Sequence, residues 1–85
     1  MKSRYYKTDL GSIHYFDSGL DIQETIVFLH GFTGSSRDFL GIPDFIINNY
    51  RCLIPDLPGH GKTQVLKTGN NLHDVQRKFF KLFKI

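Results

Sequence analysis

Two apolar runs, each followed by a glycine-rich turn, are the feature of this sequence that most restricts its fold. The first run, Ile26–Leu29, leads into a His-Gly-Phe turn at residues 30–36, and the second, Cys52–Ile54, leads into an Asp-Leu-Pro-Gly-His-Gly turn. A helix-length segment separates the two runs, and this order predicts a β-α-β unit with two buried parallel strands. Ligands bind such sheets at the carboxyl ends of the strands, where both turns fall.

A hairpin is predicted before this unit. Tyr5–Lys7 and Ile13–Phe16 read as short strands, and the turn residues at 9–11 join them at a sheet edge. The strand–helix–strand order that follows favours an α/β fold with helices on the faces of a parallel sheet. Because the chain has 85 residues and few helices, it cannot cover both faces of such a sheet. We therefore expect the N-terminal part of a larger α/β domain.

Helices are predicted on both sides of the second apolar run. Apolar residues between 39 and 47 have helical spacing, but a Gly-Ile-Pro interruption predicts a helix in two pieces. Ser35 or Ser36 could cap its start, and Asn70 or Asn71 could cap a final helix. One face of that final helix would be apolar, with Leu72, Val75, Phe79, Leu82 and Phe83.

The charge of the chain changes near its end. The net charge is +3, and residues 62–85 carry six Lys or Arg side chains and a single acid, Asp74. We therefore divide the sequence into a partial α/β domain, residues 1–63, and a basic amphipathic helical tail, residues 64–85.

Composition argues against several classes of protein. No apolar run approaches the ~20 residues of a membrane span, and the residues after the basic N-terminus are too polar for a signal peptide. Cys52 has no partner in the chain and lies in an apolar run. We interpret it as a small buried hydrophobe in a reducing, cytoplasmic setting. No nucleic-acid-binding motif is present, so no nucleic-acid partner is expected.

The first glycine turn is a candidate oxyanion hole. Gly31 would let the strand turn sharply, because glycine accepts backbone angles that other residues resist. Amide hydrogens after it would then point into the cleft, and such fixed dipoles stabilise a developing oxyanion. We expect the backbone amide of Phe32 to be the donor, on a turn formed by His30 and Gly31. The residues alone leave open a structural turn in which His30 only hydrogen-bonds locally.

The second glycine turn is a candidate pocket wall. A proline fixes its entry and two glycines flank a histidine, a pattern that suits a loop reversing the chain. We assign Gly59, His60 and Gly61 to the wall, together with Thr33 from the first turn. A direct catalytic role for Asp56 or His60 is the alternative.

Together the turns resemble the α/β-hydrolase superfamily, in which His-Gly-aromatic after one strand supplies the oxyanion hole and the following strand ends in Asp-x-x-Gly-x-Gly. The resemblance covers residues 5–63. Residues 30–36 and 56–63 are most similar to the 2-succinyl-6-hydroxy-2,4-cyclohexadiene-1-carboxylate (SHCHC) synthase family of menaquinone and phylloquinone biosynthesis, which eliminates pyruvate from a succinyl-cyclohexene carboxylate. The resemblance implies a small carbonyl-containing substrate and no metal or organic cofactor. General esterases and C–C hydrolases have similar turns and are the alternative.

The nucleophile of this superfamily lies in a Gly-x-Ser-x-Gly elbow after the next strand, and the 85 residues contain no such elbow. Ser36, His30 and Asp56 would be a tempting triad, but the resemblance places them in the oxyanion and wall turns. We therefore expect no nucleophile in this chain and no catalysis by it alone. Truncation, a frame shift or a split gene with a complementing C-terminal fragment would produce this pattern.

Two alternatives of other classes remain. Gly61-Lys62-Thr63 is typical of the end of a P-loop, but the first glycine of that motif would be Asp56, whose carboxylate would repel phosphate. The basic tail could instead make the chain a non-enzymatic remnant or an interaction module that binds an anionic membrane. A helix packed on the sheet is the simpler interpretation, so no membrane partner is expected.

Overall fold

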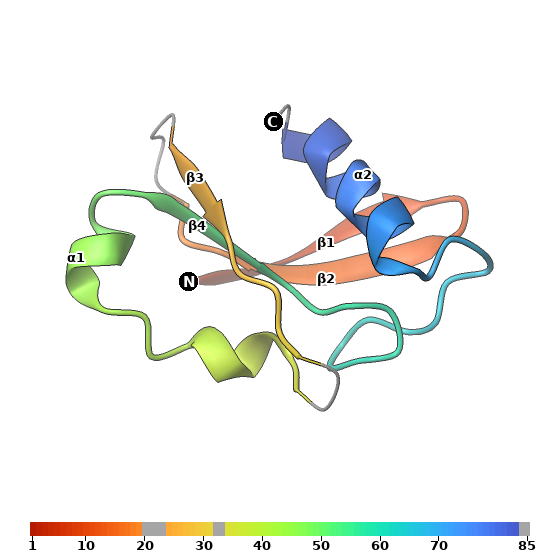
Figure 1. The fold of residues 1–85 in the computed structure, drawn as a ribbon, viewed down its shortest axis with the longest axis horizontal. Helices are drawn as coiled ribbons and strands as arrows, with labels where there is room; N and C mark the ends of the chain where they lie inside the picture. Colours follow the sequence, from red (N-terminus) through yellow and green to blue (C-terminus); the bar gives the residue numbers. More distant parts are fainter. Residues whose placement is uncertain (20–23, 32–33, 84–85) are drawn as a thin grey trace.

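A mixed four-stranded sheet in the order β1-β2-β4-β3 forms the centre of the protein (Figure 1). We analysed a computed structural model, which describes residues 1–19, 24–31 and 34–83. The hairpin strands pair antiparallel, as do β2 and β4, whereas β3 and β4 pair parallel. The strands are β1, Lys2–Thr8; β2, Gly11–Asp17; β3, Thr25–Val27; and β4, Arg51–Pro55. The predicted α/β fold, with an edge hairpin before a parallel pair, is confirmed.

The β1–β2 hairpin is longer than its sequence pattern predicted. Each strand has seven residues. The sequence pattern predicted shorter strands because β1 is mostly exposed and its outer residues show no apolar pattern. The Thr8 hydroxyl closes the turn by donating to the Gly11 carbonyl at 2.8 Å and accepting the N–H of Leu10 at 3.2 Å. Gly11 has φ of +140°, and a Cβ there would lie 2.8 Å from Leu66, so the turn packs closely on the tail.

β3 is shorter than the predicted strand. Its three residues pair with Arg51–Leu53 of β4, and the Phe28 N–H still donates to the Leu53 carbonyl at 2.9 Å. Leu29, the last residue of the predicted strand, is 42% exposed. The apolar run therefore continues past the end of the ladder.

The helix between β3 and β4 comes in two pieces, as predicted. The first is a 3₁₀ helix, η1, Ser36–Phe39, and the second is α1, Asp44–Ile47. Ser35 caps the first piece, because its hydroxyl accepts the N–H of Arg37 at 3.3 Å. The Asp38 carboxylate accepts the N–H of Ser35 in return, at 3.4 Å, which completes a capping box.

The final helix, α2, spans Leu72–Phe83. Asn71 caps it, because its side-chain oxygen accepts the N–H of Asp74 at 2.9 Å. Val75 is 1% exposed, whereas the side chains of the other four residues of the predicted apolar face lie outside the described parts. No helix in the described part of the chain is long and apolar enough to cross a bilayer.

The apolar core lies between the sheet and the tail. It combines residues of β2, β4, the segment before α2, and α2 itself: Ile13, Tyr15, Leu53, Leu66 and Val75. Cys52 is fully buried in β4, as predicted, and burial raises the pKa of its thiol. The buried apolar surface thus draws on both segments into which we divided the sequence.

An ion pair ties β2 to β4 at the end of the sheet far from the glycine turns. The Asp17 carboxylate accepts two bonds from the Arg51 guanidinium, at 2.8 and 3.2 Å, and a third from the N–H of Gly19 at 2.8 Å. Burial raises the pKa of Asp17, but the bonds from Arg51 and Gly19 and the charge of Arg4 outweigh it. The pKa of Asp17 therefore lies below its ordinary value.

Candidate functional site

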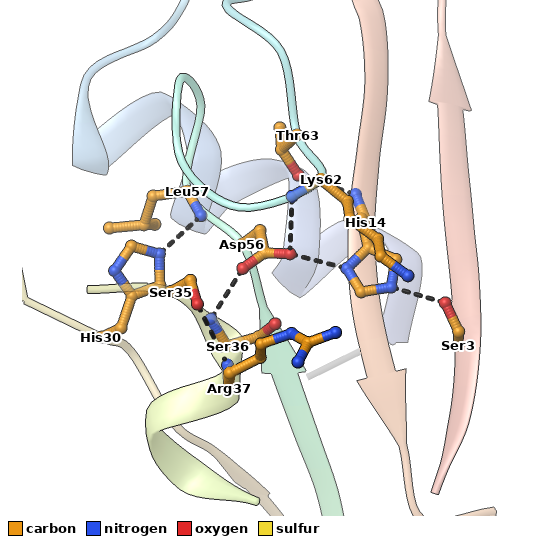
Figure 2. A network of polar contacts seen from close by, with 10 residues as sticks. All are labelled: Ser3, His14, His30, Ser35, Ser36, Arg37, Asp56, Leu57, Lys62 and Thr63. Atoms are coloured by element: carbon orange, nitrogen blue, oxygen red, sulfur yellow. Dashed lines mark hydrogen bonds and ion pairs between the residues drawn. The ribbon is translucent and has the colours of Figure 1, made fainter.

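Asp56 is the centre of a buried polar network at the carboxyl end of β4 (Figure 2). Its side chain is 2% exposed. One carboxylate oxygen, Oδ1, accepts the N–H of Ser36 at 2.7 Å. The other, Oδ2, accepts the N–H of Lys62 at 3.1 Å and lies 2.7 Å from Nδ1 of His14. The network therefore joins β2, the start of η1 and the second glycine turn.

The Asp56 carboxyl is ionised at neutral pH although it is buried. Burial raises its pKa, but the N–H groups of Ser36 and Lys62, the His14 ring and the Ser36 hydroxyl outweigh this effect. The pKa therefore lies below its ordinary value. An ionised carboxylate can only accept hydrogen bonds, so Nδ1 of His14 carries a proton and donates it.

His14 is fully buried on β2 and is not among the site residues predicted from the sequence. Its Nε2 lies 2.6 Å from Oγ of Ser3, and its backbone N–H donates to the Thr63 hydroxyl at 2.8 Å. The ring lies between Tyr5 and Phe16, with centroid separations of 5.1 and 4.9 Å. A single histidine among apolar strand residues belongs to no motif. The alternation of side chains along the strand could have indicated only that His14 is buried.

The second glycine turn reverses the chain tightly. The N–H of His60 donates to the Leu57 carbonyl, and the N–H of Thr63 donates to the His60 carbonyl, both at 2.9 Å. Gly59 and Gly61 have φ of +79° and +49°, in the left-handed region that favours glycine. The two glycines are thus required by the backbone, as the loop interpretation predicted.

The bond from Lys62 to Asp56 argues against the P-loop alternative. In a P-loop, backbone N–H groups of this region point at phosphate oxygens. Here the N–H of Lys62 donates to a carboxylate at 3.1 Å, so a negative charge already occupies the place of the anion. Pro58 has no N–H to offer. The geometry therefore favours a structural turn over a nucleotide site.

His30 joins the two glycine turns. The N–H of Leu57 donates to Nε2 of His30 at 3.0 Å, so Nε2 carries no proton. Nδ1 then holds the proton and donates it to the Gly31 carbonyl at 2.7 Å. The His30 side chain is therefore held as one neutral tautomer, and His30 is only 5% exposed. Its role is wider than the local hydrogen bonding that the sequence left open.

The remaining candidates of the first turn are only partly described. Phe32 and Thr33 lie outside the described residues, so the oxyanion donor stays a prediction. Gly31 has no positive φ, so position 31 itself does not use the left-handed backbone that favours glycine. Ser36 contacts Asp56, but the ring nitrogens of His30 bond to Leu57 and Gly31 instead, so these three residues form no triad.

The wall residues of the second turn lie at the surface. Gly59 and Gly61 are exposed, and His60 is half-buried with its ring 5.0 Å from that of His30. Their contact with a substrate stays a prediction. Within residues 1–19, 24–31 and 34–83, no cluster of His, Cys, Asp or Glu could hold a metal ion.

Acid should destabilise this fold through Asp17 and Asp56. Both carboxyls have folded-state pKa values below the ordinary value of 3.8. Their contribution to stability is therefore complete above that value and is lost as the pH falls through the lower folded-state pKa. We expect the free energy of unfolding, measured by urea titration, to fall steadily below about pH 4. The Asp17→Asn variant should show a shallower fall, and a wild-type stability that stays flat down to about pH 2 would contradict this expectation.

Comparisons with known proteins give the site a context. Residues 24–84 match the sequence profile of a family described as alpha/beta hydrolase fold. The chain is 38% identical over 53 residues to a 2-succinyl-6-hydroxy-2,4-cyclohexadiene-1-carboxylate synthase of Yersinia enterocolitica, a match that covers 62% of this chain and 19% of the synthase. It is 40% identical over 58 residues to the coelenterazine h 2-monooxygenase of Renilla reniformis, covering 68% of this chain and 18% of that protein.

The fold comparison agrees with the sequence profile. The crystal structure of the N-acyl homoserine lactonase AidH, complexed with N-butanoyl homoserine, matches with a TM-score of 0.80 at 22% identity. This match covers 100% of the present chain and 33% of the lactonase. The 85 residues therefore span about a fifth of the two sequence relatives and a third of the lactonase.

Proposed function

This chain belongs to the α/β-hydrolase fold family, and from this premise we propose that it supplies the oxyanion and pocket-wall part of a pyruvate-eliminating enzyme of the SHCHC synthase type. The supporting observation is the hydrogen bond between the N–H of Leu57 and His30, 3.0 Å long. It holds the turn after β3 against the turn after β4, where ligands of parallel sheets bind. The identity of 38% with the Yersinia synthase supports the choice of reaction.

In this proposal the backbone amide of Phe32 donates to the substrate carbonyl oxygen as negative charge develops on it. Thr33, Gly59, His60 and Gly61 form the adjoining pocket wall. The neutral His30 tautomer fixes the distance between the two turns and moves no proton. The substrate is a small molecule, the setting is cytoplasmic, and neither a metal nor an organic cofactor takes part.

The elbow nucleophile, acid and base of the family would come from a segment beyond these 85 residues, such as a complementing C-terminal fragment. The isolated chain would therefore not eliminate pyruvate. A general ester or C–C hydrolase is the second candidate, because the matched family is described as alpha/beta hydrolase fold. The identity of 40% with the Renilla monooxygenase also indicates that similar sequences serve more than one reaction.

A chimera tests this function. Residues 1–85 would replace the matching segment of the Yersinia synthase, and pyruvate release from the succinyl-cyclohexene precursor would be followed with lactate dehydrogenase. We expect pyruvate release, with a loss of about 10²–10³ in kcat on Phe32→Pro, which removes the amide donor. Phe32→Leu keeps the amide and is the matched control.

The other outcomes separate the alternatives. A folded chimera that hydrolyses p-nitrophenyl butyrate, loses this activity on Phe32→Pro and releases no pyruvate would support the ester hydrolase. A folded chimera with neither activity would overturn the proposal in favour of a non-enzymatic remnant. Equal kcat values for Phe32→Pro and Phe32→Leu would exclude the oxyanion role of this amide.

A further inference from the structure

Three side chains from three neighbouring strands or their ends form a continuous polar chain in Figure 2: Ser3, His14 and Asp56. Oγ of Ser3 lies 2.6 Å from Nε2 of His14, and Nδ1 of His14 lies 2.7 Å from Oδ2 of Asp56. Because the ionised carboxylate holds the imidazole proton on Nδ1, Nε2 is left to accept the serine hydroxyl proton. A hydroxyl next to a base that a third group orients is the signature of an activated nucleophile.

The three residues of this network differ in their exposure to solvent. His14 and Asp56 are 0% and 1% exposed, and the rings of Tyr5 and Phe16 flank the imidazole. Ser3 lies on an exposed strand at the edge of the sheet. A reagent in solution can therefore reach the hydroxyl, while the base beneath it is shielded from water.

The backbone of β1 offers a hydrogen-bond donor beside the hydroxyl. The carbonyl of His14 accepts the N–H of Asp56 at 2.9 Å, and its N–H donates to Thr63, so its backbone groups face away from β1. Tyr5 pairs with His14, so its own N–H points away from β2. Ser3 lies two residues before Tyr5 on the same strand, and its N–H therefore also points away from β2. Within the described residues no strand pairs with that side of β1. The Ser3 N–H is thus open to an oxyanion formed at its own side chain.

We propose that Ser3 is a reactive nucleophile, with His14 as its general base, and that it accepts acyl groups from small carboxylic esters. Oγ attacks the carbonyl carbon, and the hydroxyl proton passes to Nε2 of His14. The bond to the leaving oxygen then breaks, and the alcohol departs with that proton, which leaves an ester on Ser3. Water regenerates the hydroxyl by the reverse sequence. The reaction uses none of the residues proposed for pyruvate elimination and needs no second fragment.

Labelling of the 85-residue chain with a fluorophosphonate probe tests this assignment. Oγ would form a bond to phosphorus, the phosphorus–fluorine bond would break, and the proton would pass to His14 before release to solvent. We expect one label per chain, located on Ser3 by mass spectrometry, at a rate about 10²-fold above that of Ser3→Ala. Ser3 is an exposed residue, so Ser3→Ala should fold, and Ser12→Ala on the adjacent strand should label as the wild type does. Labelling at another residue, or equal rates in wild type and Ser3→Ala, would overturn the proposal.

A second measurement tests the base without a fluorophosphonate. In the Ser3→Cys variant the neighbouring imidazole should promote thiolate formation, so iodoacetamide should react about 10-fold faster than with Ser12→Cys near neutral pH. The buried Cys52 provides the background rate, measured on the wild type. Similar rates for the two variants would show that His14 does not act as a base toward position 3.

Discussion

Replacing Asp56 with alanine should destabilise the protein by about 3–5 kcal/mol, because three hydrogen-bond donors would lose the buried carboxylate that accepts from them. The change would leave the N–H groups of Ser36 and Lys62 and the Nδ1–H of His14 without their acceptor. Unpaired buried donors of this kind cost roughly 1–3 kcal/mol each, although the costs do not add simply. The midpoint of urea unfolding, followed by circular dichroism, measures the effect.

Asp38→Ala is the matched control. Its carboxylate also accepts a backbone N–H, that of Ser35 at 3.4 Å, but Asp38 is exposed. We expect it to cost about 1 kcal/mol or less, the usual value of a helix cap. If the two alanine variants unfold at the same urea concentration, Asp56 does not hold the three segments together.

The features predicted from the sequence are those that neighbouring residues encode. The apolar runs before the glycine turns predicted β3 and β4 because strand residues buried in a parallel sheet form such runs. The caps at Ser35 and Asn71 were predicted for a similar reason, since each side chain bonds a backbone N–H two or three residues away. The ends of β1 were missed because an exposed edge strand lacks an apolar pattern.

The buried network could not be predicted in this way. His14 is 42 residues from Asp56 and 11 residues from Ser3, and their contact depends on the register of three strands. A slip of one residue would turn His14 to the other face of the sheet and break both bonds. The ion pair between Asp17 and Arg51 depends on the same pairing of β2 with β4. The oxyanion role of Phe32 and the division at residue 63 stay predictions.

Replacing Gly61 with alanine should cost about 3 kcal/mol, because two penalties combine at this position. Its φ of +49° strains a residue that carries a side chain, by about 1–3 kcal/mol. A Cβ on Gly61 would also overlap the Asp56 carboxylate and push it away from His14. Gly59→Ala is the matched control in the same turn, with φ of +79° but only a contact of 3.3 Å to the exposed Val65, and should cost about 1–2 kcal/mol. Urea unfolding measures the loss of unfolding free energy in both variants. Equal losses would mean that backbone strain alone requires glycine at position 61, and that the overlap with Asp56 adds nothing.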